Sequence, residues 1–367
     1  MTPARAYYPG FQALRGLGCL GVVVQHASGY AGMLAPGPTA TITSLNLGGS
    51  GIMLFFALSA FLMLERSEDP IGRFTLDRLR RVFPLLWISL LVAGAASYYV
   101  HHATGLRWTT FLLIPTTVPA YVPVPFWSLS FELLFYLLVA LGGLGGRNTV
   151  ITVVLLWCAI GIAFHQSPYD PLNHALYPQI YPFFVTVFGY YFAAGILARI
   201  GFDPQSRLRW IYGLGAVGLY VTVQWHLLPS WVYAVVPVDR HGSLFFGLLA
   251  VGCFLAIRAA ALWTPRSLPA RMLGRIGDYS YGIYLMHMTC MMLLHRWLEA
   301  LGLPLGFWTA MTIMVVVPLA VSSLWGELDL SMQRAIKRLT TRRSADRQWP
   351  DAPAAPQLAG GRSAPLA

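Results

Sequence analysis

The feature that most constrains this chain is a series of long apolar runs separated by short polar segments. A helix needs about 17–25 mostly apolar residues to cross a bilayer. Only 11% of the 367 residues are charged, against about 25% in a soluble domain, so the chain could not cover the surface of a water-soluble globule. We therefore predict an all-α integral membrane protein with about ten transmembrane helices, and we exclude a soluble enzyme, a disordered chain and a nucleic-acid-binding module. The ten predicted spans are approximately 11–29, 48–64, 82–100, 126–144, 149–165, 181–200, 210–228, 243–262, 281–298 and 306–326.

The basic residues predict the orientation of these spans. With the N-terminus placed inside, 21 of the 25 Lys and Arg residues fall in cytoplasmic segments, as the positive-inside rule requires. Both termini are therefore expected in the cytoplasm, and the net charge of +11 is a topology signal rather than a sign of nucleic-acid binding. The short apolar stretch 108–119 ends in prolines, and we interpret it as an interfacial or re-entrant segment.

The polar C-terminal end differs from the rest of the chain. Residues 1–335 are predicted to form one transmembrane domain, and residues 336–367 a polar, disordered cytoplasmic tail rich in Arg and then in Ala, Pro and Gly. The four cysteines all lie in apolar runs without a CxxC spacing, so we expect no metal site and no disulfide.

The first span carries two ionisable residues, Arg15 and His26. Eleven helical residues turn through about 1100°, which leaves them on one face and about 16 Å apart along the axis. Ionisable groups are costly in hydrocarbon and mark functional sites, so both are candidates. The alternative is that Arg15 reaches the interface and that a neighbouring helix satisfies His26.

The fourth span contains the one carboxylate placed well inside any predicted span, Glu132. Ser128, Glu132 and Tyr136 are spaced i, i+4 and i+8 and share a helix face. Because this helix enters from outside, we expect Glu132 at a depth similar to that of His26, where the two suit general acid–base catalysis. A structural Glu paired with a basic or hydroxyl group is the alternative.

Two further regions carry candidate residues. Arg78 and Arg81, at the cytoplasmic mouth of the third span, present one face whose guanidinium groups suit phosphate binding, although positive-inside topology accounts for them equally well. His287 in the ninth span is as compatible with linking helices as with a site.

Taken together, these motifs resemble the acyltransferase-3 family of bacterial integral-membrane acyltransferases. The resemblance covers most of the chain and is specific because six elements occur in order at compatible spacing. The matching elements are Arg15 to His26, Phe55-Phe56-Ala57-Leu58-Ser59, Arg78 to Arg81, Trp127-Ser128-Leu129-Ser130 with Glu132 and Tyr136, Ser280-Tyr281 to His287, and Trp325-Gly326-Glu327.

This resemblance implies a function. Members transfer an acyl group, usually acetyl from acetyl-CoA, to a hydroxyl of a glycan or lipid-linked saccharide, and this chain resembles the stand-alone type without an appended periplasmic domain. The implied location is the bacterial cytoplasmic membrane, with acyl-CoA as substrate, no permanently bound cofactor, and a homo-oligomer compatible with the sequence. We expect His26 and Glu132 to be catalytic and Arg15, Arg78 and Arg81 to bind the donor. The expected supporting residues are Trp127, Ser128, Ser130, Tyr136, Ser59, Tyr281 and His287.

Two alternatives remain open from the sequence. A transporter or flippase of glycan intermediates would also place ionisable groups within ten spans, although no inverted repeat is evident. An acyltransferase acting on a small, macrolide-like acceptor would share the chemistry but not the glycan. In the acyltransferase, His26 would act as a general base or would carry the acyl group transiently.

Overall fold

The structure is a computed structural model that describes residues 8–114, 124–163, 188–225, 227 and 241–345. Within these ranges all regular elements are helices and no strand occurs, as the sequence predicts. The α-helices are α1 (Pro9–Leu34), α2 (Thr39–Ser44), α3 (Leu47–Leu64), α4 (Ile71–His101), α5 (Trp108–Phe111), α6 (Trp127–Gly142), α7 (Arg147–Ala163), α9 (Gly189–Arg199), α10 (Arg209–Gln224), α12 (His241–Ala261), α13 (Leu268–Leu301) and α14 (Phe307–Ala345), and short 3-10 turns lie at Val124–Phe126 and Gly143–Gly145.

Each predicted span overlaps a described helix, but fewer of these helices qualify as spans by themselves. Residues 164–165, 181–187, 226 and 228 of the predicted spans lie outside the described ranges. Six segments are long and apolar enough to cross a membrane: Pro9–Leu34, Thr39–Leu64, Ile71–His101, Trp127–Gly145, Leu244–Ala261 and Phe307–Leu339. The helices α7, α9 and α10 are shorter over their described residues, and α13 carries several charged residues along its first turns. The six segments indicate a multi-pass membrane protein, and the count of ten spans and the orientation of the termini stay predictions.

Two predicted boundaries can be compared with the structure. The segment predicted as interfacial at 108–119 begins with the single-turn helix α5, and its residues from 115 onward lie outside the described ranges. The tail predicted to be disordered from residue 336 starts as helix instead, because α14 continues to Ala345. The rest of that tail, residues 346–367, lies outside the described part of the chain.

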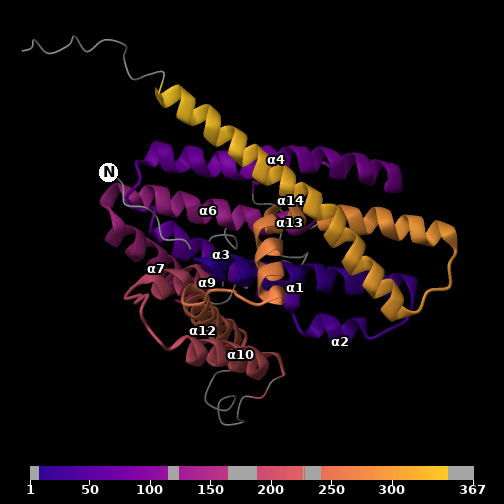
Figure 1. The fold of residues 1–367 in the computed structure, drawn as a ribbon, viewed down its shortest axis with the longest axis horizontal. Helices are drawn as coiled ribbons and strands as arrows, with labels where there is room; N and C mark the ends of the chain where they lie inside the picture. Colours follow the sequence, from indigo (N-terminus) through magenta and orange to yellow (C-terminus); the bar gives the residue numbers. More distant parts are fainter. Residues whose placement is uncertain (1–7, 115–123, 164–187, 226, 228–240, 346–367) are drawn as a thin grey trace, which may run out of the picture.

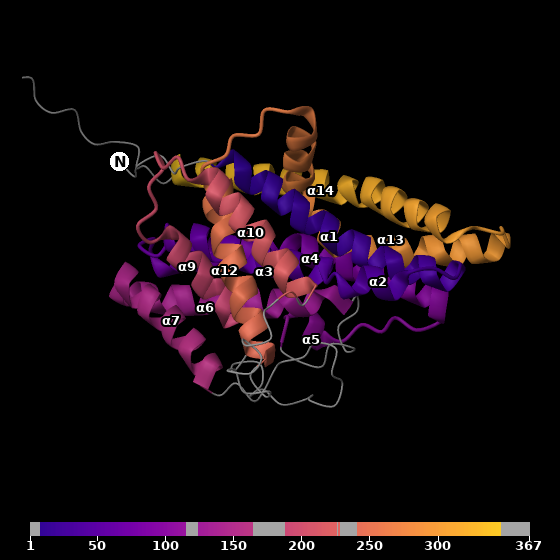
Figure 2. The same ribbon diagram turned by 90° about the horizontal axis from the view of Figure 1, so that it is seen from below.

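The N-terminal helix α1 is packed among α3, α13 and α14 (Figures 1 and 2). Glycines allow the approach of α1 to α13 at two points: a Cβ at Gly16 would meet the Leu273 carbonyl of α13, and one at Gly277 would meet the Gln12 carbonyl of α1. Small residues let helix backbones approach closely inside a membrane. This contact fixes α1 against α13 and so fixes the relative positions of the polar side chains that the two helices carry.

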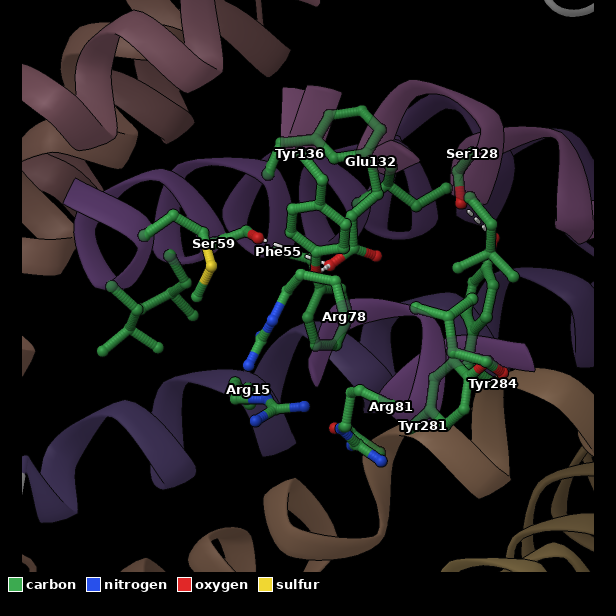
Figure 3. A pocket seen from close by; sticks show the side chains of 18 residues that line it. Arg15, Phe55, Ser59, Arg78, Arg81, Ser128, Glu132, Tyr136, Tyr281 and Tyr284 are labelled. Carbon is green, nitrogen blue, oxygen red and sulfur yellow. Dashed lines mark hydrogen bonds between the residues drawn. The ribbon is translucent and has the colours of Figure 1, made fainter. Parts of the chain in front are cut away.

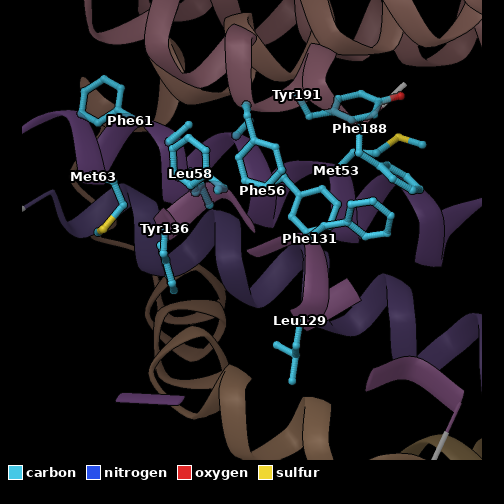
Figure 4. Packing of buried hydrophobic residues seen from close by; sticks show 14 of the residues in the cluster. Met53, Phe56, Leu58, Phe61, Met63, Leu129, Phe131, Tyr136, Phe188 and Tyr191 are labelled. Carbon is cyan, nitrogen blue, oxygen red and sulfur yellow. The ribbon is translucent and has the colours of Figure 1, made fainter. Parts of the chain in front are cut away.

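An aromatic cluster holds α6 against α3 and α9 (Figure 4). The Phe131 ring of α6 lies 4.9 Å from that of Phe188, and the Phe56 ring of α3 lies 4.7 Å from that of Phe192 of α9. Aromatic rings at 4.5–7 Å contribute beyond the area they bury. The cluster packs the apolar side of α6, and the neighbouring side, which carries Glu132, faces a space lined also by α3, α4 and α13.

A polar contact at the end of α3 ties the segment before α1 to α9. Glu65 Oε1 accepts hydrogen bonds from the Tyr8 hydroxyl at 3.2 Å and from Arg199 Nε at 3.0 Å. Burial, followed by the neighbouring Glu65 carboxylate, raises the pKa of Tyr8 above its usual value, so this hydroxyl stays a proton donor at neutral pH.

Candidate active site

A cavity of about 160 Å³ lies where α1, α3, α4, α6 and α13 meet (Figure 3). Its polar lining joins residues from five separate stretches of the sequence, and its apolar wall comes mainly from α3. The polar lining residues are Arg15, Ser59, Arg78, Arg81, Ser128, Glu132, Tyr136, Ser280, Tyr281 and Tyr284.

The predicted face of α6 is confirmed. Ser128, Glu132 and Tyr136 all line the cavity, because residues four apart stack on one side of a helix. Glu132 accepts hydrogen bonds from the Tyr136 hydroxyl and, at 3.3 Å, from the Ser59 hydroxyl of α3. Its carboxylate is therefore held from two sides, and α3 and α6 are linked through it.

Three arginines meet at this cavity, as Figure 3 shows. The Arg78 guanidinium lies 5.8 Å from the Tyr136 ring centre, and that of Arg81 lies 4.8 Å from the Tyr281 ring centre. Arg81 also forms an ion pair with Asp329 of α14, which is buried. Within the described part of the chain the Arg15 guanidinium has no hydrogen-bond partner, but it interacts electrostatically with Arg81 and Glu132.

The charges of the cavity therefore favour an anion. Three guanidinium groups line it against one carboxylate, Glu132, and the Asp329 carboxylate neutralises Arg81 from outside the lining. Arg15 and Arg78 are therefore available to bind a further negative group. Nε of Arg78 is buried without a partner among the described residues. A buried cationic donor without a partner is costly, and a phosphate or carboxylate would satisfy it.

Glu132 and His26 do not contact each other in the structure, and their catalytic roles stay predictions. Glu132 lines the same cavity as Arg15, whereas His26 lies eleven residues further along α1, about 16 Å at the helical rise, and is not part of the lining. Their neighbours differ instead: Glu132 accepts hydrogen bonds from Ser59 and Tyr136, whereas His26 contacts His287.

Ser128 and Tyr284 form the end of the cavity nearest the histidines. Their hydroxyl oxygens are 2.6 Å apart, and the Tyr284 hydroxyl also donates to the Pro125 carbonyl. Because that carbonyl can only accept, the Ser128 hydroxyl is the donor to Tyr284. The Tyr284 ring centre then lies 6.0 Å from that of His287, so the cavity and the histidines are neighbours along α13.

His26 contacts His287 rather than a carboxylate. His26 Nδ1 and His287 Nε2 are 2.9 Å apart, and His287 Nδ1 lies 3.0 Å from the Ile283 carbonyl oxygen. The two histidines are 261 positions apart in sequence, and the close approach of α1 and α13 brings them together.

The other predicted residues divide into two groups. Tyr281 lines the cavity and donates to the Val82 carbonyl at 2.6 Å. Trp127 and Ser130 are buried in α6 outside the cavity lining, and the Trp127 ring packs 5.4 Å from that of Phe188. The sequence did not single out Asp329 or Tyr284. Asp329 could have been found as an acidic residue three positions after the last predicted span, and Tyr284 as a tyrosine three positions before His287.

The donor set for a metal is not assembled in the described ranges. No group of three or more His, Cys, Asp or Glu side chains lies close enough there to hold an ion, and the four cysteines are free thiols.

A charged cavity therefore lies next to a pair of histidines, and both are enclosed by apolar helices. The model of the acyltransferase-3 family, described as an acyltransferase domain, matches residues 8–326. The chain belongs to this family and is an acyltransferase.

Comparison with individual proteins agrees with the family. The exopolysaccharide production protein ExoZ of Rhizobium meliloti is 28% identical over 66% of this chain and 76% of its own length. Nodulation protein 10 of Rhizobium leguminosarum bv. viciae is 25% identical over 94% and 99%, respectively. A protein of Acidianus two-tailed virus that is named as an acetyltransferase, ORF330, is 23% identical over 83% and 88%. No solved structure matches the chain significantly.

Proposed function

We propose that this protein is an O-acetyltransferase of the bacterial cytoplasmic membrane that moves acetyl from acetyl-CoA to a hydroxyl of a sugar in a cell-surface or exported polysaccharide. The observation that carries the proposal is the arginine-lined cavity that ends beside His26 and His287. Similarity to a protein named for exopolysaccharide production supports the class of acceptor.

In this proposal the arginines bind the donor. Acetyl-CoA carries phosphate groups, and guanidinium groups bind phosphate through paired, charge-assisted hydrogen bonds. Within the described ranges, Arg15 and Arg78 are the two cavity arginines that have no carboxylate at ion-pair distance, so they are the principal donor-binding residues. Arg81, already paired with Asp329, adds positive potential at the same wall.

In this proposal His26 catalyses the transfer step. It takes the proton of the acceptor hydroxyl as the oxygen forms a bond to the thioester carbonyl carbon; the carbon–sulfur bond then breaks, and the proton passes from His26 to the departing CoA thiolate. In the second route, His26 itself attacks the thioester carbonyl carbon, and the carbon–sulfur bond breaks to release the CoA thiolate. The sugar oxygen then bonds to the acetyl carbon as the bond to His26 breaks, and the hydroxyl proton passes to the thiolate. Both routes require an unprotonated His26 nitrogen facing the reacting groups.

Glu132 has a different role in this proposal from the one that the sequence indicates. Held by Ser59 and Tyr136, its carboxylate offsets part of the charge of the arginines and lets them stay close together when no donor is bound. Its removal would therefore weaken donor binding, because the guanidinium groups would repel one another in a medium that screens charge poorly.

The direct test is incubation of membranes containing the full chain with labelled acetyl-CoA and polysaccharide fractions, followed by mass analysis of the product. We expect O-acetylated sugar with the native chain and none above background with His26→Ala. His295→Ala is the matched control, because His295 lies on α13 beside Tyr30, away from the cavity, and it should retain activity.

The same assay separates the alternatives. Label in a small molecule and not in polysaccharide would move the acceptor to the macrolide-like class. Movement of a glycan intermediate across the membrane without consumption of acetyl-CoA would establish a transporter and overturn the proposal. Full activity of a correctly inserted His26→Ala protein would overturn the assigned role of His26.

A further inference from the structure

We infer that His287 is a positioning residue that fixes the tautomer of His26, so that Nε2 of His26 carries the lone pair used in the transfer step. This inference rests on the proposed role of His26 and adds a second residue to it. In this chain of contacts the backbone carbonyl of Ile283 has a fixed hydrogen-bonding role.

A carbonyl oxygen can only accept a hydrogen bond. His287 Nδ1, 3.0 Å from the Ile283 oxygen, must therefore carry a hydrogen. This carbonyl belongs to the residue four positions earlier in α13, and its second lone pair allows it to accept from the side chain as well as from the helix backbone. The carbonyl thus sets the first tautomer within α13 itself.

The next step depends on the charge of His287. Its side chain is fully buried, and within the described ranges no carboxylate contacts either imidazole ring. A cationic histidine without a counter-charge is costly inside a membrane, so His287 is neutral. A neutral imidazole with a hydrogen on Nδ1 presents a lone pair at Nε2, and that nitrogen is the one that contacts His26.

The hydrogen between the two rings then belongs to His26. Nδ1 of His26 lies 2.9 Å from Nε2 of His287, and because the latter is an acceptor, the former must donate. The ring centres are 5.2 Å apart and the ring planes differ by 19°. The centre separation exceeds the nitrogen separation by about the width of an imidazole ring, so the rings meet edge to edge, with the N–H directed along the lone pair as a hydrogen bond requires.

The outcome is a defined reactive atom. With a hydrogen on Nδ1, neutral His26 has its lone pair on Nε2, the nitrogen turned away from His287. His26 is partly exposed, whereas His287 is buried, so the free nitrogen is on the accessible member of the pair. His287 also remains a hydrogen-bond acceptor when His26 gains a proton, and it orients the imidazolium without placing a permanent negative charge in the membrane.

Two substitutions separate this role from simple packing. His287→Leu removes the acceptor while keeping an apolar side chain of moderate size, and His287→Gln keeps an acceptor oxygen that can reach His26 Nδ1. We expect His287→Leu to lower kcat about tenfold or more, the effect of losing one orienting hydrogen bond, with KM for acetyl-CoA unchanged. His287→Gln should recover most of kcat.

The tautomer itself is observed by nitrogen NMR of the full chain labelled with 15N-histidine in lipid bilayers. The signals of His26 among the nine histidines are assigned by difference from His26→Asn. We expect a protonated Nδ1 and an unprotonated Nε2 for His26, and a shift toward the Nε2–H tautomer in His287→Leu. A protonated Nε2 on native His26, or equal kcat losses in the Leu and Gln variants, would overturn the inference.

This readout is independent of the proposed function. If native His26 shows the expected tautomer and yet His26→Ala is fully active, the proposed function fails and the hydrogen-bond chain stands. If His26→Ala is inactive but native His26 carries its hydrogen on Nε2, the proposed function stands and the role of His287 fails.

Discussion

Two polar regions lie next to each other inside this protein, and they are built from different chemistry. The arginine-lined cavity brings together three guanidinium groups and Glu132, with Asp329 paired to Arg81 behind it. The histidine pair has no charged partner among the described residues; His287 hydrogen-bonds to the imidazole of His26 and to the Ile283 carbonyl. The cavity and the histidine pair both include residues of α1 and α13, and the hydroxyl groups of Ser128 and Tyr284 lie between them.

The difference indicates a division of labour. Fixed positive charges inside a membrane are costly unless paired or used to bind an anion, so the cavity suits retention of an anionic substrate. A neutral imidazole with a defined tautomer suits proton transfer, because its protonation state can change within the reaction. The comparison predicts that substitution of the cavity arginines raises KM for the donor, while substitution of either histidine lowers kcat.

The largest effect is expected at His26. His26→Asn should lower kcat by about 10²–10⁴, the usual contribution of a general acid–base residue, and should leave KM for acetyl-CoA within a few-fold of native. Initial rates of labelled acetyl transfer at several acetyl-CoA concentrations measure both constants. His295→Asn, on the same helix as His287, is the control and should behave as native; a change confined to KM in His26→Asn would break the comparison.

The next effect is expected at Arg15. Arg15→Lys keeps the charge but loses the planar fork that binds phosphate through two bonds, and losing one charge-assisted bond of about 1.5–3 kcal/mol raises KM for acetyl-CoA about tenfold or more. Arg73→Lys is the matched control, since Arg73 is exposed on α4. Native KM in Arg15→Lys together with reduced kcat would place Arg15 with the histidines instead.

A smaller effect is expected at Asp329, which tests how the cavity is held rather than what it binds. Asp329→Asn removes the charge that partners Arg81 but keeps a side chain that can accept a hydrogen bond from it. We expect a loss of stability of about 1–2 kcal/mol, below the range for an entirely buried ion pair because Arg81 is 28% exposed. Thermal unfolding in detergent measures this, and an unchanged midpoint would show that the pair does not stabilise the fold.

The smallest effect is expected at Tyr284, between the two regions. Tyr284→Phe removes the hydroxyl that links Ser128 to the Pro125 carbonyl, at a cost of about 1 kcal/mol for a buried network that loses one member. We expect a small fall in unfolding temperature and a few-fold fall in kcat/KM. If kcat/KM falls as far as in His26→Asn, Tyr284 takes part in the transfer and the boundary between the two regions has to be redrawn.

Local patterns in the sequence were reliable wherever one helix carried the whole pattern. The shared face of Ser128, Glu132 and Tyr136 follows from helical geometry alone, and the structure confirms it. Arg78 and Arg81, three residues apart, both line the cavity for the same reason. The six-element resemblance predicted the family that the chain belongs to.

Contacts between distant helices could not be predicted. The partners His26 and His287, and Arg81 and Asp329, are 261 and 248 positions apart, and no periodicity links them. The expected contact between Glu132 and His26 is not formed, because Ser59 and Tyr136 hold Glu132 while His26 contacts His287 of a different helix. Ten apolar runs were read as ten spans, but composition alone does not show how many of the helices cross the bilayer.

The most direct test of the division of labour is equilibrium binding of unacylated CoA to the purified full chain in lipid nanodiscs, because it separates donor retention from chemistry. We predict that Arg15→Gln weakens binding about tenfold or more, and that His26→Asn binds CoA as the native chain does. Equal weakening in both variants would contradict the account, since it would mean that the histidine pair and the arginine-lined cavity form one binding site.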